Sequence, residues 1–170
     1  MTKAMKWGLL AAIPGLCLVL IVVWSVQRHQ DRLERETYAP ERLQQRLMAV
    51  QAGEGTLQAG DLDPERLRAQ EQDRIVQLLA RDLSFTPHPD PDQALALLTP
   101  GAVSLVASEA GLLAALTRRL QALPQEPWQV TVVDVGHWRL AVGESCLELR
   151  NLSATEADWR WTSITRCDAG

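Results

Sequence analysis

The side chains in this sequence that are best placed to react with each other are two cysteines near its C-terminus. Cys146 lies in the segment SCLELRN and Cys167 ends the segment WRWTSITRC, and both segments have the composition of β-strands. An antiparallel hairpin in which facing residue numbers add up to about 313 sets Cys146 opposite Cys167. The same register sets Leu149 opposite Ile164. We therefore predict a Cys146–Cys167 disulfide, with two reduced cysteines that pack in the core as the alternative.

The three histidines form no catalytic or metal-binding pattern with their neighbours. His29 lies in a polar helical segment, His137 in a predicted turn, and His88 in the Pro-rich segment TPHPDPD. Asp90 and Asp92 follow His88, but the prolines impose an extended path, and Asp92 is the expected N-cap of a short helix, QALALL. Neither a Gly-rich phosphate loop nor a G-x-S-x-G motif occurs. We therefore expect no enzyme activity, no metal, no cofactor and no small-molecule substrate.

The charge balance argues against nucleic acid as a partner. The chain has 17 Lys and Arg against 21 Asp and Glu, a net charge of −4. Binding to phosphates requires a basic face that releases counterions, and no cluster of basic residues occurs.

An uncharged run at residues 7–27, WGLLAAIPGLCLVLIVVWSVQ, predicts a transmembrane helix after a short tail at residues 1–6. A cleaved signal peptide would have a shorter apolar core and a small-x-small cleavage site. Cys17 follows Leu16, which is too bulky for lipoprotein processing, so Cys17 is expected to face lipid or another part of the helix. The sequence therefore predicts an uncleaved single-pass anchor.

The flanking charges leave the orientation of this anchor open. Lys3 and Lys6 favour a cytoplasmic N-terminus, whereas Arg28, Arg32 and Arg35 on the other side favour the reverse. The predicted disulfide decides the matter, because disulfides persist in the bacterial periplasm and not in the cytosol. We expect an inner-membrane protein with a cytoplasmic N-terminus and a periplasmic C-terminal domain.

Residues 28–85 predict a helical stalk with a break near 53–61. Leu43 and Leu47 recur at helical spacing, while Pro40 is expected to interrupt a continuous helix from the membrane. This stretch is either a solvated stalk or a weak coiled coil, in which Leu43 and Leu47 would contact a partner or a second copy.

A second helix of the stalk has a well-marked start. Asp63 is the expected N-cap and Pro64 occupies the first helical position. After this helix, residues 86–101 are expected to form a Pro-rich linker.

Residues 102–170 predict an α+β domain in which one helix packs on a small antiparallel sheet. The expected order is strand–helix–strand–strand–strand–strand. The strands are expected at 102–108, 129–135, 138–143, 145–151 and 159–167, with the helix opened by Ser108 and Glu109. Trp159 and Trp161 alternate, so they share one face of the last strand. They belong either to the core or to a binding face, where Trp is favoured.

The stretch VSLVASEAGLLAALTRRLQALPQEPWQVTVVDV (103–135) resembles a region of the bitopic assembly-platform proteins of type II secretion systems and type IV pili. The similarity lies in a strand, a Leu-rich helix, a Pro-containing turn and a Val-rich strand. The resemblance implies a periplasmic coil, a ferredoxin-like domain, dimerisation and a link between cytoplasmic machinery and the outer membrane. The Cys146/Cys167 hairpin and the Trp-rich ending depart from that family's pattern.

Two functions follow as hypotheses. The first is a non-catalytic envelope protein that positions partners, with the lipid bilayer and other envelope proteins or a second copy as its contacts. The alternative is a membrane-anchored inhibitor, such as an immunity protein against a periplasmic toxin, because a small disulfide-bonded domain on an anchor suits that role equally.

Overall fold

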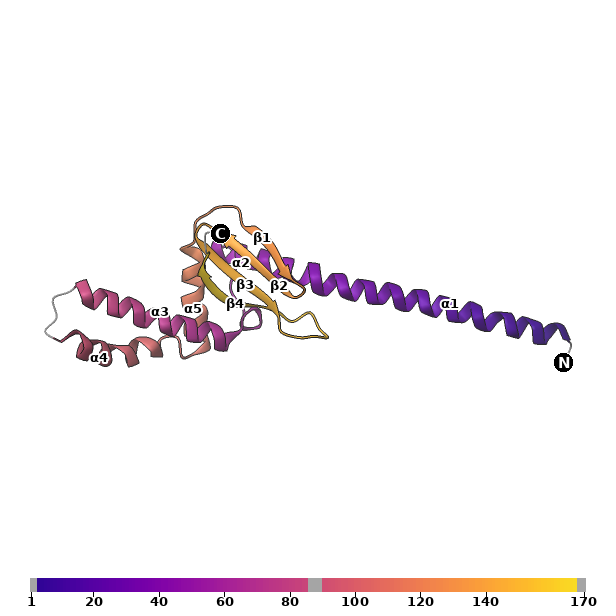
Figure 1. Cartoon of the computed structure of the whole chain (residues 1–170), viewed down its shortest axis with the longest axis horizontal. Helices are drawn as coiled ribbons and strands as arrows, with labels where there is room; N and C mark the ends of the chain where they lie inside the picture. Colours follow the sequence, from indigo (N-terminus) through magenta and orange to yellow (C-terminus); the bar gives the residue numbers. More distant parts are fainter. Residues whose placement is uncertain (1–2, 86–89, 168–170) are drawn as a thin grey trace.

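The computed structural model of the chain describes residues 3–85 and 90–167, with side chains from residue 18 onward within the first range. A long helix, α1 (Lys3–Leu33), extends away from a compact domain at its C-terminal end (Figure 1). The domain contains four further helices and a four-stranded antiparallel sheet. The predicted α+β class is therefore confirmed in its coarse form.

The sequence predicted that Pro40 interrupts the helix from the membrane, but the helix continues through Pro40. A π-turn, Glu34–Tyr38, joins α1 to α2 (Ala39–Gln51), and the backbone N–H of Ala39 bonds to the carbonyl of Glu34. A proline lacks the N–H that an α-helix needs and its ring crowds the carbonyl four residues earlier. The wider π-turn accommodates this crowding, so the prediction of an interruption was wrong.

Helix α2 belongs to the domain and not to a stalk. Leu43, Leu47 and Val50 are fully buried, and α2 packs against α5 (Glu109–Gln121) and the last strand. The predicted stalk is therefore wrong for this segment. An apolar stripe that is too sparse for a coiled coil is sufficient to fill one side of a small core.

Helices α3 (Pro64–Phe85) and α4 (Pro91–Ser104) form an antiparallel hairpin that projects from the domain (Figure 1). Helix α3 begins as predicted, and the backbone N–H of Arg66 bonds to the Asp63 carboxylate at 3.3 Å. A 3₁₀ turn, Ala59–Asp61, occupies the predicted break.

The prediction of a Pro-rich linker at residues 86–101 was wrong for its described part. The predicted linker is helical from Pro91 onward, and its N-cap is Asp90, which accepts a bond from the Gln93 N–H, in place of Asp92. His88 lies outside the described residues. The predicted strand 102–108 is the end of α4 and a turn, because a short apolar run suits a helix as well as a strand.

Four predicted strands are confirmed and form a meander. They are β1 (Gln129–Asp134), β2 (His137–Val142), β3 (Ser145–Asn151) and β4 (Trp159–Arg166), in the spatial order β1-β2-β3-β4. Gly136, with a φ of 85°, supplies the left-handed backbone of the first turn. Because the described residues contain no strand before α5, they do not form the ferredoxin-like arrangement that the resemblance implied.

The register of the last hairpin differs from the predicted one by two residues. Ile164 pairs with Leu147 and not with Leu149, and Cys146 pairs with Thr165; a bulge follows at Glu148. The chain continues beyond β4, where the N–H of Cys167 bonds to the Glu144 carbonyl at 2.8 Å. The sulfurs of Cys146 and Cys167 then lie at disulfide distance, 2.13 Å apart, with 5.0 Å between the Cα atoms.

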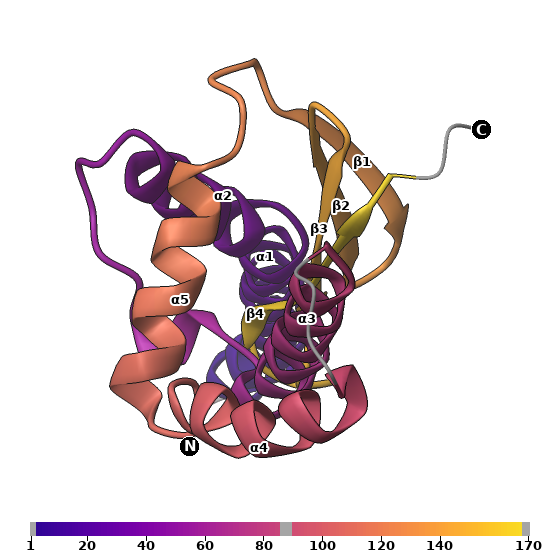
Figure 2. The ribbon, with the colours of Figure 1, turned by 90° about the vertical axis from the view of Figure 1, so that its left-hand side faces the viewer.

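The core lies between one face of the sheet and the helices α2, α5 and the start of α3, as the end-on view in Figure 2 shows. Leu112, Leu116 and Leu120 of α5 contribute the apolar face that the sequence predicted. Trp138 and Trp159 meet edge to face in this core, with ring centroids 5.9 Å apart.

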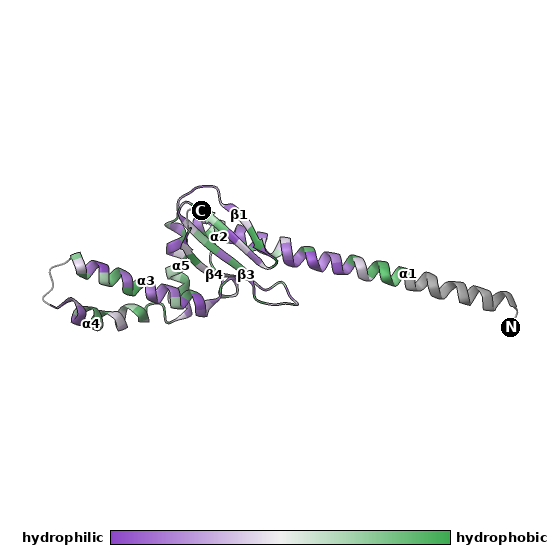
Figure 3. Cartoon of the chain, in the orientation of Figure 1, coloured by the Kyte–Doolittle hydropathy of each residue, from purple (hydrophilic) through white to green (hydrophobic). Residues whose placement is uncertain are grey.

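The side chains from Leu18 to Val26 in α1 are largely apolar and exposed, and Figure 3 colours this part of the helix as hydrophobic. Among the helices in the described part of the chain, none by itself has the length and apolar character of a membrane span. Helices α4 and α5, bent by 99° at their junction, reach that length and character only when taken together.

Candidate partner-binding surfaces

The four residues that the sequence offered as interaction sites are buried in the core. Leu43, Leu47 and Trp161 are fully buried and Trp159 nearly so. The indole N–H of Trp161 donates to the Ser163 carbonyl at 2.7 Å, and that of Trp159 donates to the Arg35 carbonyl. Of the two alternatives that the sequence left open for Trp159 and Trp161, the structure therefore shows the core. Leu43 and Leu47 are core residues as well, so they form no surface for a partner or a second copy. A domain of this size needs most of its large apolar side chains for its own core.

A polar cluster on the outer face of the sheet contains the only described histidine that is buried. His137 is the first residue of β2 and contacts one carboxylate oxygen of Glu148, while Arg139 donates to the other at 2.7 Å. Burial alone would raise the pKa of the Glu148 carboxyl, but hydrogen bonds from Arg139 and His137 outweigh it and hold that pKa below its ordinary value. Since both carboxylate oxygens are occupied, the cluster stabilises the sheet, and Glu148 has no oxygen left without a partner.

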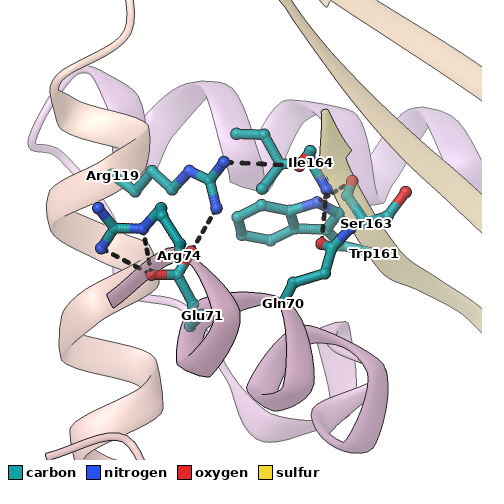
Figure 4. A network of polar contacts seen from close by, with 7 residues as sticks. All are labelled: Gln70, Glu71, Arg74, Arg119, Trp161, Ser163 and Ile164. Atoms are coloured by element: carbon teal, nitrogen blue, oxygen red, sulfur yellow. Dashed lines mark hydrogen bonds and ion pairs between the residues drawn. The ribbon is translucent and has the colours of Figure 1, made fainter. Parts of the chain in front are cut away.

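A second polar network, which the sequence analysis missed, joins α3 to α5 and β4 (Figure 4). Glu71 is fully buried, and its two carboxylate oxygens bind Arg119 and Arg74. Arg119 also reaches the Ile164 carbonyl at 3.5 Å, and the Ile164 N–H donates to the Gln70 side chain at 3.1 Å. The only signal in the sequence is the i,i+3 spacing of Glu71 and Arg74, which says nothing about the third partner.

This network closes one edge of the sheet. Beside it, Leu62 forms an isolated parallel bridge with Trp161, and the N–H of Asp63 donates to the Trp161 carbonyl at 2.9 Å. The backbone of β4 at Trp161 and Ile164 is therefore bonded on its outward side. An edge strand covered in this way cannot take up another strand.

The opposite edge of the sheet is uncovered. All six residues of β1 are exposed, and no side chain in the described part of the chain bonds to its backbone. Val130 and Val132 pair with the buried residues Leu140 and Trp138, so they lie on the helix-facing side of the sheet. They are nevertheless 41% and 62% exposed, because the helices do not extend over β1.

The helical hairpin α3–α4, which we call the arm, projects at the end of the molecule farthest from the N-terminus (Figure 1). Its exposed apolar side chains are Leu78, Phe85, Leu97 and Leu98, and exposed Leu105 follows the end of α4. Apolar residues gathered on one projecting element are typical of an interaction surface.

A groove of about 410 Å³ lies at the base of the arm, between α3 and α5. Apolar side chains such as Ile75 and Val106 line it together with Arg74, Arg118 and Arg119, and none of its lining residues is acidic. Gly111 permits this geometry, since a Cβ there would lie 1.9 Å from the Leu105 carbonyl oxygen. The groove suits an apolar side chain with a carboxylate beside it.

Comparison with known proteins gave no match: no family model, no curated protein and no solved structure is similar to this chain. In the described part of the chain, no group of three or more His, Cys, Asp or Glu side chains could hold a metal ion.

Proposed function

We propose that this chain is a membrane-tethered, non-catalytic binding module that positions partner proteins at a bilayer surface. The observation that carries this proposal is that exposed apolar side chains lie in two separate parts of the molecule, on α1 from Leu18 to Val26 and on the arm. The two helical parts project from opposite sides of the domain (Figure 1). The domain between them fixes the distance and direction from one end to the other.

The tether is the uncharged run at residues 7–27, of which the part from Leu18 onward has described side chains. Every apolar side chain exposed to water costs about 25 cal/mol per Å² relative to an apolar environment. A lone helix with apolar side chains on all sides therefore favours a bilayer. The Cys146–Cys167 pair favours an oxidising compartment, hence the periplasm, for the domain.

The partner site is the arm together with the groove at its base. Leu97 and Leu98 supply apolar contact area. Arg118 at the groove is exposed, and its described bond is to the Ala114 carbonyl and not to a carboxylate. This combination favours a partner surface that is apolar and acidic. The buried carboxylates Glu71 and Glu148 are both occupied by arginines, which supports binding over catalysis.

The tether can be tested by fractionation of cells that express the full chain. We expect the chain to stay in the membrane pellet after carbonate extraction and to become soluble when residues 7–27 are deleted. In intact spheroplasts, a membrane-impermeant maleimide should label Cys146 and Cys167 only after reduction. Labelling that requires disruption of the membrane, and no reductant, would place the domain in the cytoplasm.

The arm can be tested with a photo-crosslinking amino acid at Leu97, which is 75% exposed. We expect a discrete adduct with another protein that is lost when Leu98→Asp is added. The matched control places the same crosslinker at Leu152, an exposed leucine in the β3–β4 loop. Equal adducts at the two positions, or an adduct insensitive to Leu98→Asp, would contradict a partner site on the arm.

A further inference from the structure

The uncovered edge of β1 offers bonds that no described residue uses. An edge strand presents every second N–H and C=O outward, and natural proteins usually block them with lysines, prolines, bulges or a covering element. The strand β1 contains no Lys, Arg or Pro, and three of its six residues are valines. The opposite edge, at β4, is closed by Gln70, Asp63 and Arg119.

A bulge sets the length of this edge. The pairing of β1 with β2 is regular from Gln129 to Val132 and shifts between Val132 and Asp134. A bulge bends the strand and twists the edge away from regular pairing. The regular edge is therefore Gln129–Val132, long enough for about four residues of an added strand.

The side chains along this edge define what an added strand would carry. Val130 and Val132 expose apolar surface on the helix-facing side of the sheet. Gln129 and Thr131 lie on the other side, where they pair with Ala141 and Arg139. Cross-strand neighbours on one face stabilise a sheet when both are apolar. The matching segment has apolar, preferably β-branched, residues at alternate positions and polar residues between them.

Geometry disfavours a second copy of this chain as the occupant. Two β1 strands that pair antiparallel are related by a two-fold axis normal to the sheet. Since α1 extends alongside the plane of the sheet (Figures 1 and 2), this axis would point the two α1 helices in opposite directions. Two helices tethered to one bilayer cannot be arranged in that way.

We propose that the Gln129–Val132 edge of β1 binds an extended segment of a partner protein, which joins the sheet as a fifth strand. Backbone hydrogen bonds provide affinity in this mode of recognition, and alternate side chains provide specificity. The inference deepens the proposed binding function and rests on the proposed tether only where it excludes a second copy. It adds a site remote from the arm, so the module would contact a partner at two places.

The test selects from a displayed library of random decapeptides against the full chain in lipid nanodiscs. We expect enriched peptides with apolar residues at alternate positions, bound at least tenfold more weakly by Val132→Lys. The matched control is Val135→Lys, which introduces the same charge at a 79% exposed valine beyond the bulge and should bind as the unaltered chain does. Amide hydrogen exchange in Gln129–Val132 should slow when the peptide binds.

N-methylation of the selected peptide separates strand addition from simple apolar contact. Two peptides are compared, one methylated at its odd-numbered amides and one at its even-numbered amides. One of them should lose binding and the other should keep it, because only alternate N–H groups face β1. Equal effects of the two methylation patterns, enrichment without alternation, or equal losses in Val132→Lys and Val135→Lys would overturn the inference. So would Thr131→Cys chains that form disulfide-linked dimers in the nanodisc. Because Leu98→Asp should leave peptide binding unchanged, failure at β1 and failure at the arm are distinguishable.

Discussion

At the β4 edge of the sheet, groups from the start of α3 and from α5 bond to the outward backbone of the strand, whereas the β1 edge has no such cover in the described part of the chain. Both strands belong to one meander, and each is an outer strand of the sheet. The difference arises outside the strands, in which helix lies beside each of them. The covered edge is therefore expected to contribute more to the stability of the domain than the uncovered one, where we propose that a partner binds.

Of the changes at the two edges, replacement of Trp161 by Ala should lower the free energy of unfolding most. Trp161 is fully buried beside the closed edge, and its loss leaves a cavity that costs about 4 kcal/mol. Thermal unfolding of the full chain in nanodiscs, followed by near-UV circular dichroism, measures this cost. Val132→Ala, at the open edge, is the matched control and should change the unfolding free energy by less than about 0.5 kcal/mol. Similar losses at the two edges would contradict the comparison.

Arg119→Met should cost about 3 kcal/mol, because Glu71 would stay buried with Arg74 as its one remaining cationic partner. The same unfolding measurement applies. The double variant Glu71→Leu/Arg119→Met should recover most of this loss, since no buried charge is left without compensation. A double variant as unstable as Arg119→Met would show that the cost comes from lost packing.

Removal of the Cys146–Cys167 bond should cost about 3 kcal/mol, the chain-entropy value for a closed loop with a sequence separation of 21. The variant with both cysteines replaced by Ser measures this cost relative to the oxidised chain. Added reductant should lower the melting temperature of the unaltered chain and leave that of the double-Ser variant unchanged. A melting temperature insensitive to reductant would show that the bond does not form.

The Glu148 cluster should make the stability of the domain fall in acid. The effect should be smaller than those of the three preceding changes. The folded state lowers the pKa of Glu148, so its contribution is complete above the ordinary pKa of a carboxyl and is lost as the pH falls through the folded value. Melting temperatures from pH 7 to pH 3 should therefore decline less in Glu148→Gln than in the unaltered chain. Parallel declines would contradict the assigned role of Arg139 and His137.

Val132→Lys should have the smallest effect on stability, within about 0.5 kcal/mol, because a 62% exposed side chain makes few contacts. Its effect should appear in binding to the open edge instead. A large loss of stability would show that β1 already has a structural role there.

Local chemistry was sufficient to predict the helix start at Asp63 and Pro64, the opening of α5 at Ser108 and Glu109, and the strands that became β1 to β4. Caps, turns and alternation act over a few residues, so they can be read in the sequence. Residues 102–108 were different, since a short apolar run suits both a strand and the end of a helix. That stretch became the end of α4, a helix that packs along α3, and a turn.

The sequence by itself determined the uncharged run, the cysteine pair and the order of the strands. Only the tertiary structure decided that α2 joins the core, that Glu71 binds two arginines and that β4 is closed while β1 is open. These outcomes depend on contacts between residues far apart in the chain, such as Glu71 with Arg119 and Gln70 with Ile164. No local pattern encodes such contacts, because they arise only when the helices and the sheet pack together.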